Sequence, residues 1–201
     1  GHRAQRGGRR HRAARRRMSV TVTPEAFRFV QFDSGTVTRV AQELIAALGI
    51  DRPVHIEIDE TTPLGRVRAT IGAADGDAIA ISVESGAFED SRRPRQQSEA
   101  ATAVSLGRIL LRVRDRLHGG FGEAPADDDL ELRQMAAWET YCAGRLARLG
   151  LHVNQQRWLY NFRNRHGFTD TADAGFHQLW AADGLTWGEV DAISTAATVR
   201  S

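Results

Sequence analysis

The sequence predicts an α+β fold: a small antiparallel meander of three to four strands with two helices on one face, followed by a unit of four helices. Two observations predict this fold. Three segments, 54–59, 66–71 and 79–84, alternate apolar and polar residues, which is typical of strands covered on one side only. Before and after these segments, apolar residues recur every three or four positions, as in amphipathic helices.

The three alternating segments also predict their own register. Gly76 suits the left-handed position of a three-residue hairpin loop over 74–76, and residues 60–65 would form the other loop of the meander. Every apolar residue then faces an apolar one, so the polar face would be a solvated surface of ion pairs. The predicted pairs are Arg66 with Asp59 and Glu84, and Arg68 with Glu57 and Ser82.

The segment before the meander is expected to supply one more strand and the first helix. Phe27 and Phe29 alternate about Arg28, which indicates a short strand, although Thr23-Pro24-Glu25 could equally start a helical turn. Ser34 is expected to cap a helix that ends at Gly49, because glycine commonly follows a helix in the left-handed conformation.

The remaining helices are expected after a polar loop over 85–97. Ser98 should cap a helix that runs to about Leu117. All four tryptophans fall in the C-terminal part and are expected to belong to the core of a helical unit. The helices expected in that unit run from Asp129 to Gly150, over 152–165, over 171–182, and from the capping box at Thr186.

These elements predict a division into an α+β unit over 18–118 and a helical unit over 129–201. Residues 119–128, rich in glycine and acids, would link them. Residues 1–17 hold eight arginines and no acid, and are expected to be a disordered tail. A basic arm, a transit peptide and a non-native leader are three interpretations of the tail, and a start at Met18 favours the third.

Composition excludes several classes of protein. No apolar run reaches the roughly 18 residues of a membrane span. Cys142 is the single cysteine, so an intramolecular disulfide is impossible and a cytoplasmic location is expected. All 27 basic residues are arginine, as in a GC-rich bacterial genome. After the tail, 19 arginines (27 − 8) face 25 acids, so the folded body is acidic, which argues against nucleic acid as the partner.

One histidine and aspartate cluster has the loose spacing of a metal site. Two imidazoles and two carboxylates over 166–177 would suit zinc or a non-haem metal. The same residues are also explained as a junction between two helices, with Gly167 after the first helix and Thr169 or Asp170 as the cap of the next. We favour the junction. The candidate ligands are His166, Asp170, Asp173 and His177.

A second cluster combines arginine with aromatic residues over 157–166. A single helix cannot bury all of its aromatic side chains, so Tyr160 is expected to stay exposed beside Arg163 and Arg165. Arginine and tyrosine are enriched where proteins bind proteins, and they also suit single-stranded nucleic acid. We expect a protein partner here and keep RNA or DNA binding through helix 157–165 as an alternative. The residues assigned to partner binding are Tyr160, Arg163, Arg165, His166, Arg92, Arg93 and Arg95.

The polar face of the sheet is a third candidate, for acid–base chemistry by a histidine beside carboxylates. Predicted arginine partners would keep these carboxylates ionised, which argues for ion pairs instead of catalysis. No phosphate-binding loop, zinc-peptidase motif or serine-hydrolase motif occurs. We therefore expect a non-catalytic cytoplasmic protein-interaction module without a cofactor. A small metal-dependent or acid–base hydrolase is the alternative. The polar-face residues are His55, Glu57, Asp59, Arg66, Arg68 and Glu84.

Overall fold

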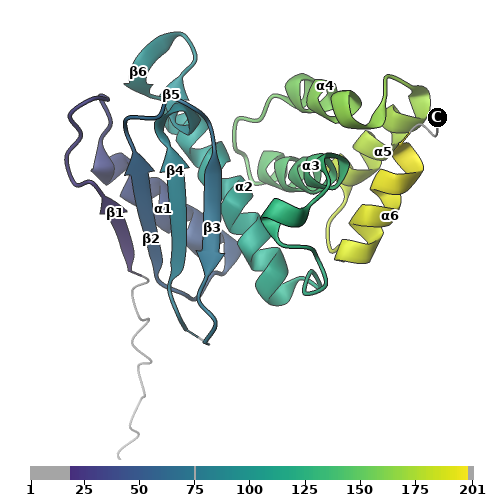
Figure 1. The fold of residues 1–201 in the computed structure, drawn as a ribbon, viewed down its shortest axis with the longest axis horizontal. Helices are drawn as coiled ribbons and strands as arrows, with labels where there is room; N and C mark the ends of the chain where they lie inside the picture. Colours follow the sequence, from purple (N-terminus) through teal and green to yellow (C-terminus); the bar gives the residue numbers. More distant parts are fainter. Residues whose placement is uncertain (1–18, 75, 199–201) are drawn as a thin grey trace, which may run out of the picture.

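The computed structural model describes residues 19–74 and 76–198, and shows an α+β unit beside a helical unit (Figure 1). Residues 1–17, for which a disordered tail is predicted, lie outside the described residues. The strands are β1 (Val20–Thr23), β2 (Val54–Asp59), β3 (Val67–Ile71), β4 (Ile79–Glu84), β5 (Glu89–Asp90) and β6 (Arg93–Gln97). The helices are α1 (Ser34–Leu48), α2 (Glu99–His118), α3 (Leu132–Arg148), α4 (Gln155–His166), α5 (Asp170–Ala181) and α6 (Trp187–Ala197), with short 3₁₀ turns η1 (Ser85–Ala87) and η2 (Asp127–Asp129).

The main sheet is mixed, in the order β1-β2-β4-β3, so the predicted antiparallel meander is wrong in its pairing. β2 runs parallel to both of its neighbours, β1 and β4, and only β3 and β4 are antiparallel. The predicted register between β3 and β4 is present, with Arg68 opposite Ser82. Arg68 is not opposite Glu57, however, because β4 lies between their strands.

The chain reaches β3 from β2 by passing over the end of β4. The backbone N–H of Ser85 donates to the carbonyl of Thr62 at 3.1 Å and pins this crossing. Gly86 makes the close approach possible, because a Cβ at this position would lie 2.3 Å from the carbonyl oxygen of Pro63. Charge pairing on a polar face cannot distinguish this order from a meander. Burial can: the apolar residues of β2 are fully buried and those of β3 only partly, so β3 belongs at the edge.

The first strand also lies elsewhere than predicted. Val20–Thr23 pairs with β2, whereas Phe27 and Phe29 fall in a bend. The carboxylate of Glu60 holds this bend by accepting from the backbone N–H groups of Arg28 and Phe29. β1, α1 and β2 thus form a parallel strand–helix–strand unit, which a search for alternating residues alone does not reveal.

α1 and α2 both pack on one face of the sheet, as predicted, and Figure 1 shows them behind it. The core between the layers consists of the buried side chains of β2 and β4 and the apolar faces of the two helices. Asp33, one residue before the predicted Ser34, caps α1, and Gly49 ends it with a φ of 66°. Ser98 caps α2 as predicted. The expected loop over 85–97 contains η1 and the small hairpin of β5 and β6.

The C-terminal unit contains four helices, and α3 contacts the other three as well as α2. Glu131 caps α3, not the predicted Asp129, because the chain first forms the turn η2. The capping box of Thr186 and Glu189 is present at the start of α6. Phe121, in the segment expected to be a linker, is fully buried and stacks on Trp138 at a centroid distance of 4.8 Å.

A buried ion pair joins α2 to α3. Both carboxylate oxygens of Asp115 accept from the guanidinium of Arg145, at 2.8 and 2.7 Å, and the indole N–H of Trp138 donates to the same carboxylate at 2.8 Å. Burial alone would lower the pKa of Arg145, but its hydrogen bonds with Asp115 outweigh this effect and raise the pKa. The guanidinium of Arg145 therefore keeps its charge beside Asp115.

Beside this pair, arginines on one face of α2 alternate with carboxylates from other elements. Glu139 of α3 lies between Arg108 and Arg112, and Asp127 of η2 lies between Arg112 and Arg116. Burial would raise the pKa of Glu139, yet the two arginines beside it hold that pKa below its ordinary value. We call this row of five side chains the charge ladder. It attaches α3 and η2 to α2.

Asp115→Asn should destabilise the protein by about 3–5 kcal/mol, because it leaves the buried guanidinium of Arg145 without a counter-charge. Asp128→Asn is the control: its pair with Arg68 is exposed and should contribute less than about 1 kcal/mol. Urea denaturation followed by circular dichroism measures both losses. Equal, small losses in the two variants would show that the buried pair does not hold α2 and α3 together.

Candidate functional site

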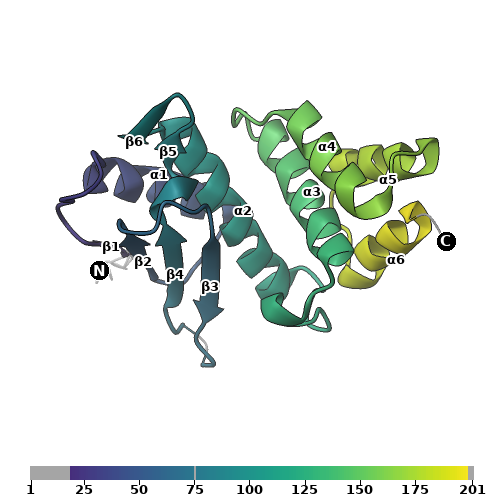
Figure 2. The ribbon, with the colours of Figure 1, turned by 45° about the horizontal axis from the view of Figure 1, so that its top comes forward.

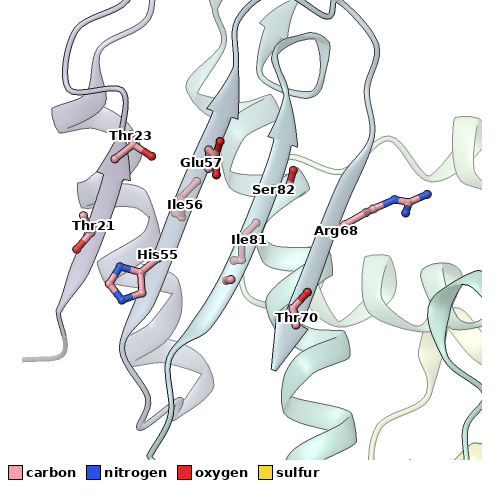
Figure 3. A pocket seen from close by; sticks show the side chains of 10 residues that line it. Thr21, Thr23, His55, Ile56, Glu57, Arg68, Thr70, Ile81 and Ser82 are labelled. Carbon is pink, nitrogen blue, oxygen red and sulfur yellow. The ribbon is translucent and has the colours of Figure 1, made fainter. Parts of the chain in front are cut away.

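The sheet face opposite α1 and α2 is open and carries a shallow hollow of about 310 Å³ (Figure 3). Polar side chains of four strands point to this side because residues alternate along each strand. The residues that line the hollow are Thr21, Thr23, His55, Ile56, Glu57, Arg68, Thr70, Ala80, Ile81 and Ser82.

The strand register arranges these side chains in rows. One row runs from Thr23 through Glu57 and Ser82 to Arg68, and the neighbouring row contains His55. Arg68 does not turn toward Glu57 but pairs with Asp128 of η2 at 3.4 Å. The predicted ion pair across the sheet is therefore replaced by one that joins the sheet edge to η2.

The two acids predicted to pair with Arg66 have other contacts. Asp59 accepts from the side-chain and backbone groups of Thr61 and from the hydroxyl of Thr62. These hydrogen bonds, chiefly that of Thr62, lower the pKa of Asp59 to about 2. Glu84 accepts from the backbone N–H of Arg66, not from its guanidinium. Asp59 is thus a capping group of the β2–β3 connection.

The open face holds groups that could act as acid, base or nucleophile, but it does not connect them. Among the described residues, no hydrogen bond joins the side chains of His55, Glu57 and Ser82. A nucleophile is normally activated by a base within hydrogen-bond reach, which this face does not show. The described residues of this face thus present a polar surface of hydroxyl groups together with the imidazole of His55 and the carboxylate of Glu57.

The four candidate metal ligands lie in different surroundings. His166 ends α4 and is buried, with 2% of its surface exposed, whereas Asp170 and His177 are exposed on α5. Asp173 accepts two hydrogen bonds from Arg163, at 2.7 and 2.6 Å. In the parts of the chain that the structure describes, no three His, Cys, Asp or Glu side chains gather so as to hold a metal ion. The cap of α5 is Thr169, as one of the two predicted alternatives.

His166 belongs to the packing between α4 and α6, not to the exposed partner surface to which it was assigned. Its Nδ1 lies 3.1 Å from the carbonyl of Phe162, and its Nε2 lies 2.8 Å from the hydroxyl of Ser194. The imidazole also stacks on the ring of Phe162 at 3.7 Å between centroids. Burial, partly offset by the hydrogen bond with Phe162 and assisted by the charge of Arg133, lowers the pKa of His166.

The corner between α4 and α5 exposes two aromatic rings. Tyr160 is 58% exposed, as predicted for this residue, and Phe168 in the turn is 63% exposed. The rings contact each other edge to face at 6.0 Å between centroids. Arg165, three residues before Phe168, is exposed, while Arg163 is half-buried in its pair with Asp173. We call the surface formed by Arg157, Tyr160, Asn161, Asn164, Arg165 and Phe168 the aromatic corner.

The other arginines assigned to partner binding lie on the β5–β6 hairpin. Arg92, Arg93 and Arg95 are all exposed. Arg93 pairs with Asp90, and the carbonyl of Arg95 accepts from the backbone N–H of Gln31 at 2.7 Å. The hairpin is far along the fold from α4 (Figures 1 and 2), so the arginines form two separate surfaces.

Two features of the structure were not predicted from the sequence. Phe168 follows Gly167, and its exposure could have been expected because a turn between two helices has no core to face. A polar hollow of about 290 Å³ beside the Asp115–Arg145 pair, lined on one side by residues 183–185, could not have been expected. Its residues come from α2, α3 and the α5–α6 connection, and no spacing in the sequence joins them.

Comparisons with protein-family models, with curated proteins and with solved structures gave no match to this chain. None of the helices in the described residues has both the length and the apolar composition needed to cross a membrane. Cys142 is a buried thiol whose pKa is raised by burial, so it is a poor nucleophile.

Stability should fall on acidification because His166 is buried in its neutral form. Its folded pKa lies below the unfolded value of about 6.5, so unfolding takes up a proton once the pH falls below that value. The free energy of unfolding is therefore expected to decrease from about pH 7.5 to about pH 5.5, two values on either side of that pKa. His166→Gln should reduce this decrease, as measured by urea denaturation at both pH values.

His177→Gln is the matched control for this experiment, because His177 is exposed on α5. It should leave the pH dependence of the wild type unchanged. If His166→Gln also keeps the full pH dependence, another group causes it and the buried histidine does not.

Proposed function

We propose that this protein is a non-catalytic protein-interaction module and that the aromatic corner is its binding surface. The observation that supports the proposal is the pair of exposed rings, Tyr160 and Phe168, in mutual contact. Exposed aromatic residues gathered with arginine are typical of the sites that contribute most to protein binding. Burial of such a ring beneath a partner contributes about 1.5–3 kcal/mol.

The corner is held in place before any partner arrives. The doubly hydrogen-bonded pair of Arg163 and Asp173 joins α4 to α5, and His166 joins the end of α4 to α6. A surface that is already ordered loses little conformational entropy on binding, so more of the contact energy appears as affinity.

The alternatives have less support. The folded body carries an excess of acids, which disfavours nucleic-acid phosphates, and Asp170 lies exposed next to the corner. Catalysis on the open sheet face would need a connected acid, base or nucleophile, and no hydrogen bond joins these groups there. The proposal also places the protein in the cytoplasm, because its one cysteine is a free buried thiol.

The test compares Tyr160→Ala/Phe168→Ala with wild type in affinity capture from an extract of the native host. We expect the double variant to lose the captured partner by at least tenfold, since two buried rings are worth more than the roughly 1.4 kcal/mol of a tenfold change. Phe29→Ala is the matched control, because Phe29 is equally exposed, at 61%, but lies on the α+β unit. Quantitative mass spectrometry and circular dichroism provide the measurements.

Full capture by the folded double variant would contradict the proposal. Loss of capture in the Phe29 control alone would move the binding surface to the α+β unit. Strong binding of the wild type to single-stranded RNA, with a steep dependence on salt, would favour the nucleic-acid alternative.

A further inference from the structure

We propose that the aromatic corner binds an acidic segment, residues 123–132, of a second copy of this chain. The inference rests on the proposed function, because it names the partner of the same surface. It combines two complementary surfaces of the described residues, one basic and aromatic and the other acidic and aliphatic.

The first surface is free of negative charge along its own segment. No acidic residue occurs between Gln155 and Thr169. Arg157 and Arg165 are exposed and form no ion pair with any described residue. Arg157 precedes Tyr160 by three residues, so the two share one face of α4, and Asn161 and Asn164 continue that face with amide groups. The corner therefore offers two exposed rings together with two exposed guanidinium groups that pair with no acid in the described part of the chain.

The second surface has the opposite character. Residues 123–132, EAPADDDLEL, contain five acids and no base. Asp127 is used by the charge ladder, but Glu123 and Asp129 are exposed and have no ion pair among the described residues. Asp128 keeps 77% of its side chain exposed in spite of its contact with Arg68. Leu132, the last residue of the segment, is 63% exposed. Exposed carboxylates thus precede an aliphatic side chain that the fold leaves in water.

The opposite charges of these two surfaces favour a second copy of this chain as the partner of the aromatic corner. The carboxylates of Glu123 and Asp129 would meet the guanidinium groups of Arg157 and Arg165, and Leu132 would cover Tyr160 and Phe168. Two aromatic corners would repel each other because both are positively charged. The charges therefore determine that the corner of one copy faces the acidic segment of the other.

The two surfaces of one chain lie apart. The acidic segment follows the C-terminal end of α2 and contacts β3 through Asp128. In Figure 1 the connection between α2 and α3 lies below α3, whereas α4 lies above it. α4 packs on α3 and α5. The contact is therefore between copies and is heterologous, and its repetition produces head-to-tail chains, or a ring where the rotation between copies closes. Its small size predicts weak association, and its exposed charges make it sensitive to salt.

Sedimentation velocity of the full chain and of two variants tests whether copies associate through these two surfaces. The corner variant, Arg157→Glu/Arg165→Glu, keeps the acidic segment. The segment variant, Asp129→Arg/Leu132→Ser, keeps the corner. All four positions are exposed, so circular dichroism should show unchanged folding. Glu43→Arg, on the exposed surface of α1, is the control for charge reversal elsewhere.

Wild type and the control should show an average mass that rises with concentration and falls with added salt. Each of the two variants alone should stay monomeric, with an apparent Kd raised at least tenfold, which corresponds to about 1.4 kcal/mol. An equimolar mixture of the two variants should form dimers and nothing larger, because one intact corner meets one intact segment and neither copy can extend the chain.

A wild type that is monomeric at its highest soluble concentration overturns the inference. So does self-association that the two variants leave unchanged, or a mixture of variants that stays monomeric while the wild type associates. The proposed function is separable: if Tyr160→Ala/Phe168→Ala loses a different captured protein while the wild type is monomeric, the corner remains a binding surface and only its partner was wrong.

Discussion

The charged contact between α2 and α3 is the constraint on which the arrangement of the two units depends. α2 has two working faces: an apolar one against the sheet and α1, and an arginine-rich one that forms the charge ladder. Removing buried charges from water is costly, so Glu139 and Asp115 are tolerable only where arginines meet them. That requirement fixes how far α3 is shifted along α2. The aromatic rings of Phe121 and Trp138 then fill the remaining space. The position of every later helix follows, because each of them packs on α3.

The outward side chains of β2 and β4 explain why this protein has an open polar face. Parallel strands are usually covered by helices on both faces. Here β2 and β4 are parallel, yet their outward side chains are hydroxyls, alanine, histidine and acids, which gain little from burial. Two helices on the inner face complete the core without a third layer. The charge of Arg68 on β3 protects the sheet edge from unwanted strand pairing, and its ion pair with Asp128 joins that edge to η2.

The choice of which side chains α4 buries also determines where the aromatic corner lies. α4 directs Leu159 and Phe162 into the helical unit, so Tyr160 must face outward, and the turn at Gly167 leaves Phe168 without a neighbour to bury it. Two polar contacts, that of Arg163 with Asp173 and that of His166 with Ser194, keep this exposed surface ordered. The rings are thus exposed because of helix geometry, and the surface that carries them is ordered because of the two polar contacts.

Local physical chemistry in the sequence was enough to predict most elements. Alternation of apolar and polar residues predicted β2 to β4, and apolar residues at a spacing of three and four predicted the helices. Ser98 and Thr186 predicted the starts of α2 and α6, and Gly49 predicted the end of α1. All of these signals depend only on residues that are near neighbours in the sequence. Pairing order was decided by tertiary structure. Arg68 can meet an acid or a hydroxyl in either sheet, so complementarity on a polar face carries no information about which strand lies between two others. The site residues divide in the same way. Tyr160 was predictable from one helix, whereas the buried place of His166 depends on Ser194, a residue 28 positions away that only the folded chain brings within reach.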